Sequence, residues 1–262
     1  MTMENAIYDT EGALKIGAVI TTHDALPFIH LHLESRLRFH PDTPLLIVAF
    51  AKSESLDALC LRYGVDVVYC EAKGTETGAL LGIVKGFEWA EARGLDLLVR
   101  FSDSWVPLCS WHEGLANAAC ETQFATLSGG WATTTPRFSA EAMAFHPQSW
   151  IRFSGIQLLR ENAELETSVE PDSIIYQSAA DIFEHRCTAN TEYCERRLEP
   201  LEFGCCGFWS ISSAGTRTGA LSKNWGAAHD YLRALHQWGI ADYTLEQIEL
   251  LLNPKTPEPA KP

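Results

Sequence analysis

The segment from Leu95 to Pro107, LDLLVRFSDSWVP, holds the side chains whose types and spacing best support chemistry. Its apolar run ends on Ser102, Asp103 and Ser104. In an α/β sheet, ligands bind at the carboxyl ends of the strands, because the backbone groups there lack sheet partners and several loops converge. One carboxylate between two hydroxyls at such a place suits a phosphorylated or sugar ligand, held directly or through a metal ion. We therefore predict a ligand site at Asp103.

A second polar cluster follows the first predicted strand, KIGAVITT at 15–22, whose β-branched residues favour a strand. We expect this cluster at the ligand-binding edge of the sheet. Its members are Thr21, Thr22, His23 and Asp24. Structural alternatives remain open for two of the candidate residues. Asp24 could cap the helix that Pro27 opens, and Asp103 could cap a turn.

The predicted elements position both clusters in an α/β fold. Strands are predicted at 15–22, 45–50, 65–70 and 95–101. Helices are predicted between them at 28–40, 53–63 and 75–93, with Ser53 as an N-cap and Gly64 and Gly94 as C-terminal stops. This β-α-β-α-β-α-β order predicts a mainly parallel sheet with right-handed crossovers.

The chain after residue 107 is predicted to contain both helices and strands. Strands are expected at 124–127, 142–145 and 205–212, and helices at 110–121, 147–162, 171–186, 227–239 and 244–252. We expect a loose N-terminus at 1–14, a single α/β domain at 15–253 and a disordered, Pro-rich tail at 254–262.

Composition limits the class of partner. The 262 residues are 46% hydrophobic and 21% charged, as in a soluble globular protein. The net charge of −14 and the lack of a Lys/Arg cluster argue against nucleic acid and anionic membranes as partners. No apolar run approaches the roughly 18 residues that a transmembrane helix needs. No export signal is visible, so we expect a cytoplasmic protein with reduced thiols.

Eight cysteines are present, and four of them lie between Cys187 and Cys206, near His185. Such a density of Cys and His could bind zinc. The spacing C-x6-C-x10-C-C contains no C-x2-C pair, however, so buried thiols are the expected state.

Residues 15–107 resemble the family-2-like nucleotide-sugar glycosyltransferases of the GT-A type. The resemblance rests on TTHDALPFIHLHLESRL after the first strand, the glycine-bearing helix TETGALLGIVKGFEWA, and LLVRFSDSWVP, which stands where the family has Asp-x-Asp followed by Pro. The chain has neither G-x-G-x-x-G nor G-x-x-x-x-G-K-[ST] after a predicted strand, which argues against dinucleotide binding and P-loop hydrolysis. The resemblance implies a Rossmann-like GT-A fold with a nucleotide-binding half at 15–107 and an acceptor half at 108–253. It also implies transfer of a sugar from a nucleotide-sugar donor to an acceptor that the sequence does not identify.

The resemblance also implies roles for individual residues. Residues 21–24 would face the nucleotide. Asp103, flanked by Ser102 and Ser104, would hold a Mn²⁺ or Mg²⁺ ion that bridges the donor diphosphate, and His229 would complete that metal site. An inverting transferase uses a carboxylate to accept the proton of the acceptor hydroxyl. The candidates are Glu170 and Asp172, with charges at a helix N-terminus as the alternative.

The chain departs from the family pattern at two strand ends. Ser-Asp-Ser replaces Asp-x-Asp, and the second strand runs into AFAKS with no aspartate. Three interpretations stay open: metal-independent transfer, a contact from Lys52 to phosphate, or a binding protein without catalysis. A nucleotidyltransferase is a further class, although the Gly- and Arg/Lys-rich loop expected there is missing. Four tryptophans could stack on sugars, with core packing as the alternative; they are Trp105, Trp111, Trp131 and Trp150.

Overall fold

The computed structural model describes residues 14–23, 25–71, 75–108, 110–112, 142–145, 147–152, 155–164, 210–211, 217–218, 220–222 and 228–253. Its centre is a five-stranded sheet with the order β3-β2-β1-β4-β6. The strands are β1 (Ile16–Thr22), β2 (Leu45–Ala49), β3 (Asp66–Tyr69), β4 (Leu97–Ser102) and β6 (Ala142–Phe145). Strands β1 to β4 are mutually parallel where they pair, and β6 runs antiparallel to β4. The predicted α/β fold with a mainly parallel sheet is confirmed.

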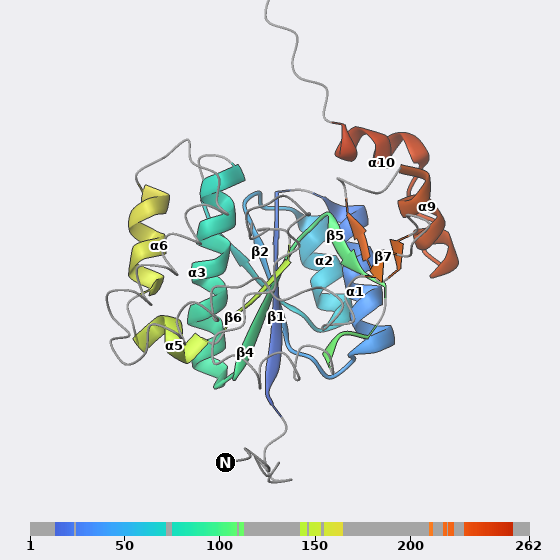
Figure 1. Ribbon diagram of the computed structural model, residues 1–262. Coiled ribbons are helices and arrows are strands. Elements are labelled where there is room, and N and C mark those ends of the chain that lie inside the picture. Colours follow the sequence, from blue (N-terminus) through green and yellow to red (C-terminus); the bar gives the residue numbers. More distant parts are fainter. Residues whose placement is uncertain are drawn as a thin grey trace, which may run out of the picture.

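Helices cover both faces of this sheet, as Figure 1 shows. Helices α1 (Leu26–Phe39) and α2 (Glu54–Tyr63) lie on one face. Helices α3 (Thr75–Arg93), α5 (Pro147–Arg152) and α6 (Gly155–Glu164) lie on the other. Strands β1 and β2 are buried along their whole length, as strands covered on both faces must be. The single helix predicted at 147–162 corresponds to two helices, α5 and α6.

Local sequence signals set several helix ends as predicted. The Ser53 hydroxyl accepts the Leu56 N–H at 3.4 Å and caps α2, and Gly64 ends that helix with φ of +62°. Gly94, with φ of +61°, follows α3. The N-cap of α1 is Ala25, whose own side chain makes no capping hydrogen bond. Asp24, considered above as a cap, lies outside the described residues.

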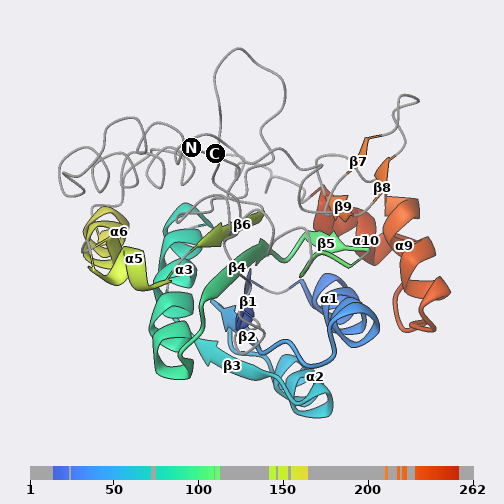
Figure 2. The same ribbon diagram turned by 60° about the horizontal axis from the view of Figure 1, so that its bottom comes forward.

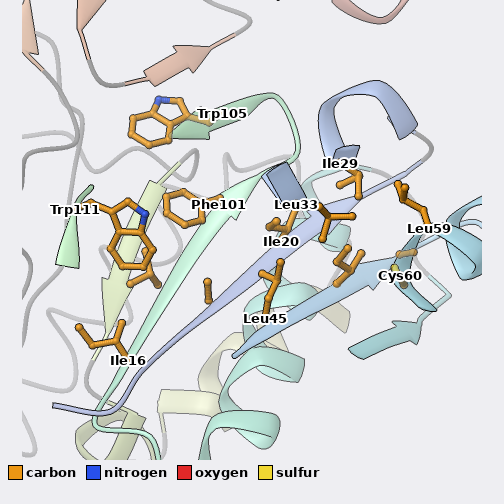
Figure 3. Packing of buried hydrophobic residues seen from close by; sticks show 14 of the residues in the cluster. Ile16, Ile20, Ile29, Leu33, Leu45, Leu59, Cys60, Phe101, Trp105 and Trp111 are labelled. Atoms are coloured by element: carbon orange, nitrogen blue, oxygen red, sulfur yellow. The ribbon is translucent and has the colours of Figure 1, made fainter. Parts of the chain in front are cut away.

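Two apolar layers fill the space between helices and sheet. Figure 3 shows the layer beneath α1 and α2, where Ile20, Leu33 and Phe101 meet. The second layer lies beneath α3 and includes Val19 and Phe87. Trp105 and Trp111 are buried in the first layer, which supports the core-packing interpretation for both. Trp131 and the side chain of Trp150 lie outside the described residues.

Strand β5 (Trp105–Pro107) and the C-terminal helix α9 (Ala228–Gln237) contact α1, and further C-terminal elements lie on the same side of the structure (Figure 2). Strand β5 pairs antiparallel with β9 (Ala220–Ser222), and β7 (Ser210–Ile211) pairs with β8 (Arg217–Thr218). Helices α9 and α10 (Leu245–Leu252) follow, and α10 begins with the predicted Thr244–Gln247 capping box. The Tyr231 ring of α9 lies 4.5 Å from the Phe28 ring of α1. Sequence reasoning did not predict the short strand β5.

Two of the eight cysteines fall in the described part of the chain, and both are free thiols. Cys60 is buried and Cys70 is half-buried. The cluster between Cys187 and Cys206 lies outside the described residues. None of the helices described is long and apolar enough to cross a membrane.

Candidate functional site

The carboxyl ends of β1 and β4 bring Thr22 and Asp103 together. The register pairs Thr21 with Ser102, so the residues that follow both strands emerge side by side. The Thr22 hydroxyl donates a hydrogen bond to Asp103 Oδ2 at 2.9 Å. The Asp103 N–H donates to the carbonyl of Thr21 at 3.1 Å. One predicted residue from each polar cluster therefore lies at the same edge of the sheet.

Thr22 also connects this edge to the first helix. Its hydroxyl oxygen accepts the Ala25 N–H at 3.2 Å, just before α1 begins. One hydroxyl thus links the end of β1, the start of α1 and the Asp103 carboxylate. This contact gives Asp103 a structural partner, and the role of its carboxylate toward a ligand stays a prediction.

Side chains from two distant helices hold the backbone of the turn after β4. His32 Nε2 of α1 lies 3.1 Å from the carbonyl oxygen of Ser102 and 2.9 Å from that of Asp103. The Tyr231 hydroxyl of α9 donates to the carbonyl of Ser104. The Ser35 hydroxyl of α1 donates to that of Pro107 at 2.5 Å. Three successive carbonyls, at 102 to 104, thus accept hydrogen bonds from side chains.

His32 is neutral at physiological pH. Only 3% of its surface is exposed, and burial lowers the pKa of its imidazole to about 4, although the two backbone contacts favour the charged form. A neutral imidazole has one N–H, and two carbonyl neighbours require that it sits on Nε2. Sequence reasoning missed this residue; the available signal was a histidine between two leucines, Leu31 and Leu33, in the helix after the first strand.

A buried arginine lies on the opposite face of the same edge. Arg100 of β4 is 4% exposed, and its Nη2 donates to the Thr21 hydroxyl at 2.6 Å. Arginine keeps its charge even when buried, so a positive group lies close to the ends of β1 and β4. Sequence reasoning missed Arg100 as well, although an arginine within LLVRFS interrupts an apolar strand.

Two rings lie at the ends of β1 and β2. The exposed His23 ring and the half-buried Phe50 ring have centroids 5.0 Å apart, tilted by 42°. The Phe50 N–H donates to the carbonyl of Thr22 at 3.0 Å, which ties the two strand ends together. Gly78 of α3 packs against the Phe50 ring, since a Cβ there would lie 3.1 Å from it. This arrangement offers a surface of two rings at the carboxyl ends of β1 and β2.

The other predicted site residues are placed differently. Lys52 is exposed and follows β2 by three residues. Ser102 is half-buried and Ser104 is buried. His229 is exposed on α9, two positions before the buried Tyr231. Three predicted residues lie outside the described part of the chain; they are Asp24, Glu170 and Asp172.

The described residues at this edge do not by themselves form a metal site. Asp103 supplies one carboxylate, and the neighbouring serine hydroxyls are weak ligands for a divalent cation. Within the described ranges, no group of three or more His, Cys, Asp or Glu side chains could hold a metal ion. Binding of Mn²⁺ or Mg²⁺ therefore stays a prediction, and the function proposed below includes no step through a metal.

The comparisons with known proteins concern the backbone arrangement. No protein-family model matches the sequence, and no curated protein is significantly similar to it. The apo form of the glycosyltransferase GlyE of Streptococcus pneumoniae TIGR4 aligns with 88% of this chain and 52% of its own, at 12% identity and a TM-score of 0.48. This chain thus spans about half the length of GlyE.

Two other solved structures align over smaller parts of this chain. A cytidylyltransferase from Leptospira borgpetersenii serovar Hardjo-bovis covers 62% of it, with 73% of its own chain aligned, 14% identity and a TM-score of 0.39. A 4-diphosphocytidyl-2C-methyl-D-erythritol synthase covers 59% of it, with 85% of its own chain aligned, 14% identity and a TM-score of 0.35. At such TM-scores these similarities carry no conclusion about function, which is argued below from the residues of this chain.

Proposed function

We propose that this chain binds a nucleotide-sugar at the carboxyl edge of β1, β2 and β4 and transfers the sugar to an acceptor. The observation that carries the proposal is the Thr22–Asp103 hydrogen bond. It places a carboxylate at the sheet edge where α/β proteins bind ligands, directly beside the strand end from which a nucleotide would be recognised.

The groups around this pair suit the parts of a nucleotide-sugar. The rings of His23 and Phe50 offer a stacking surface for a base. The Asp103 carboxylate is an acceptor for ribose or sugar hydroxyls, whereas it contacts a diphosphate only through a cation. The chain as a whole is negatively charged, which disfavours a diphosphate. The buried guanidinium of Arg100 and the exposed ammonium of Lys52 supply positive charge near the strand ends and would offset this effect.

The proposed reaction breaks the bond between the anomeric carbon and the diphosphate oxygen and forms one to an acceptor oxygen. The nucleoside diphosphate leaves with the electron pair of the broken bond. The acceptor hydroxyl proton passes to a carboxylate base. Glu170 and Asp172 are our candidates for that base, on the strength of the family resemblance. In this proposal Asp103 orients the donor rather than moving a proton.

A binding protein without catalysis is the second candidate. The single carboxylate of Ser-Asp-Ser favours it, because the Asp-x-Asp pattern that this chain resembles would supply two carboxylates to a cation. Both candidates predict nucleotide binding at the same edge. They differ in whether the bond to the sugar is broken.

Donor turnover separates the two candidates. The purified chain is incubated with UDP-, GDP-, CMP- and dTDP-sugars, with and without Mn²⁺ or Mg²⁺. Water takes the place of the acceptor, and release of the nucleoside mono- or diphosphate is measured. Release that is lost in Asp103→Ala and kept in Asp96→Ala supports a transferase. Asp96 is a matched control, since it precedes β4 at the opposite end and accepts the Lys15 N–H at 2.8 Å. Binding without release supports the binding protein, and neither binding nor release contradicts both.

A further inference from the structure

We infer that His32 is a positioning residue: its Nε2–H, shared by the carbonyls of Ser102 and Asp103, fixes the turn that aims the Asp103 carboxylate. The consequence for ligand affinity rests on the proposed function, whereas the consequence for the turn does not. Sequence reasoning assigned no role to His32, which lies on α1 and not on either strand of the site.

The donor lies where the chain leaves the sheet. The register between β1 and β4 ends at the Thr21–Ser102 pair, and the chain turns after it. One side-chain N–H placed between two successive carbonyls bonds to both of them. With distances of 3.1 and 2.9 Å, His32 Nε2 shares its proton in this way.

The same donor also sets the direction of Asp103. Its carbonyl is held by His32, its N–H by the Thr21 carbonyl, and its carboxylate by the Thr22 hydroxyl. Backbone contacts on both sides of the Cα determine where the side chain leaves the turn. Loss of the His32 contact therefore removes one restraint on the peptide after Asp103 and weakens the alignment of the carboxylate with Thr22.

The His32 ring is itself held in place. It is buried beneath α1, and its centroid lies 5.9 Å from that of the Phe101 ring of β4. A tightly packed ring has few alternative rotamers, so its N–H is oriented before any ligand arrives. Burial also keeps the imidazole neutral, as described above, which leaves Nδ1 as an acceptor and Nε2 as the single donor.

The test separates positioning from packing by comparing three substitutions in α1. In His32→Gln the amide N–H₂ reaches the place of Nε2 and keeps a donor. In His32→Leu the donor is removed and an apolar group of similar size remains. The matched control is His30→Leu, which removes a buried histidine of the same helix that contacts Tyr63 and Tyr243 instead of the turn.

The first readout is amide hydrogen exchange at residue 103, measured in the ligand-free chain. We expect His32→Leu to speed exchange of this amide about tenfold more than His30→Leu does, and His32→Gln to restore it. Equal exchange in His32→Leu and His30→Leu would overturn the inference. If His32→Leu does not fold, His32→Asn replaces it, because the shorter asparagine amide does not reach the carbonyls.

The second readout is affinity for the nucleotide that the wild-type chain binds, in a double-mutant cycle with Asp103→Ala. We expect His32→Leu to weaken binding about tenfold in the wild-type background and less than about twofold in the Asp103→Ala background, because His32 acts through Asp103. Equal losses in both backgrounds would overturn the inference. If the wild-type chain binds no nucleotide, the proposed function fails, and the exchange measurement still decides whether His32 positions the turn.

Discussion

Thr22 and Asp103 are 81 residues apart in the sequence, yet the hydroxyl of the first donates to the carboxylate of the second at 2.9 Å. The contact joins the ends of two neighbouring parallel strands, and the same hydroxyl accepts the N–H of Ala25 before α1. A single side chain therefore couples the start of a helix to the acidic residue of the candidate site.

Removal of the Thr22 hydroxyl tests that coupling. Thr22→Val takes one hydrogen bond from the Asp103 carboxylate and one from the Ala25 N–H, in a residue that is 1% exposed. We expect the free energy of unfolding to fall by about 1–3 kcal/mol, measured by urea denaturation. Thr22→Ser keeps the hydroxyl and serves as the control. Equal stability of the valine and serine variants would show that the hydroxyl does not hold the strand ends.

Gly82 tests how closely α3 must approach β1. An alanine Cβ at this position would lie 2.0 Å from Cγ2 of Thr21, a buried strand residue. We expect Gly82→Ala to destabilise the protein by about 1–3 kcal/mol, despite the higher helix propensity of alanine. The measurement is again urea denaturation.

Thr21→Ser provides the matched rescue, because it removes Cγ2 and keeps the hydroxyl that accepts from Arg100. The double variant should be more stable than Gly82→Ala alone. A fully additive loss would show that the clash with Cγ2 is not the cause.

His23 tests the ring surface at the edge. Because its side chain is exposed, His23→Ala should change the free energy of unfolding by less than about 0.5 kcal/mol. We expect it to weaken nucleotide binding by about 0.5–1.5 kcal/mol through the lost stacking, whereas His23→Phe should keep most of the affinity. Calorimetric titration measures the nucleotide affinities of both variants. Equal losses for alanine and phenylalanine would point to hydrogen bonding by the imidazole instead of stacking.

The pH dependence of stability tests the buried His40. Its Nε2 accepts the Trp111 N–H at 3.1 Å, and burial, reinforced by the stacked His112, lowers the pKa of His40 to about 4. The unfolded chain has a pKa near 6.5 at this residue, so it binds the proton more tightly than the folded chain does. The contribution of neutral His40 is therefore complete above pH 6.5 and is lost as the pH falls toward 4.

We expect wild-type stability to fall by about 2 kcal/mol more than that of His40→Gln between pH 7 and pH 5. Urea denaturation at the two pH values measures the difference. Parallel pH profiles for wild type and His40→Gln would contradict the assignment of this loss to His40.

The sequence predicts that Thr22 and Asp103 lie at the same edge of the sheet, whereas the structure shows that β1 and β4 are neighbours and that the two side chains meet. The β-branched run that ends at Thr22 and the apolar run that ends at Ser102 identify two strands, and parallel neighbours end at the same edge. The groups that hold the turn could not be predicted in this way. His32 is 70 residues from Ser102 in the chain, and Tyr231 is 127 residues from Ser104, so only the packing of α1 and α9 reveals these contacts.

Two further features could not be predicted from the sequence: a very short strand, and which side of helix α9 is buried. Strand β5 has three residues and exists by pairing with β9, more than a hundred positions away, so no local periodicity marks it. On α9, His229 is exposed and its role as a metal ligand stays a prediction, whereas Tyr231 of the same helix turn donates to the carbonyl of Ser104. His229 and Tyr231 lie within one helical turn, and the local sequence does not indicate which of the two positions packs against the rest of the protein.

The central claim is that Asp103 contributes to a nucleotide-sugar site, and calorimetric titration of nucleotides into three chains tests it most directly. Wild type, Asp103→Ala and Asp96→Ala are titrated with UDP, GDP, CMP and dTDP, with and without Mn²⁺. We predict that one nucleotide class binds wild type and Asp96→Ala equally and binds Asp103→Ala at least about tenfold more weakly. A dependence on Mn²⁺ that disappears in Asp103→Ala would assign the cation to this carboxylate. Equal affinity of all three chains, or no binding of any nucleotide by wild type at millimolar concentration, would contradict the claim.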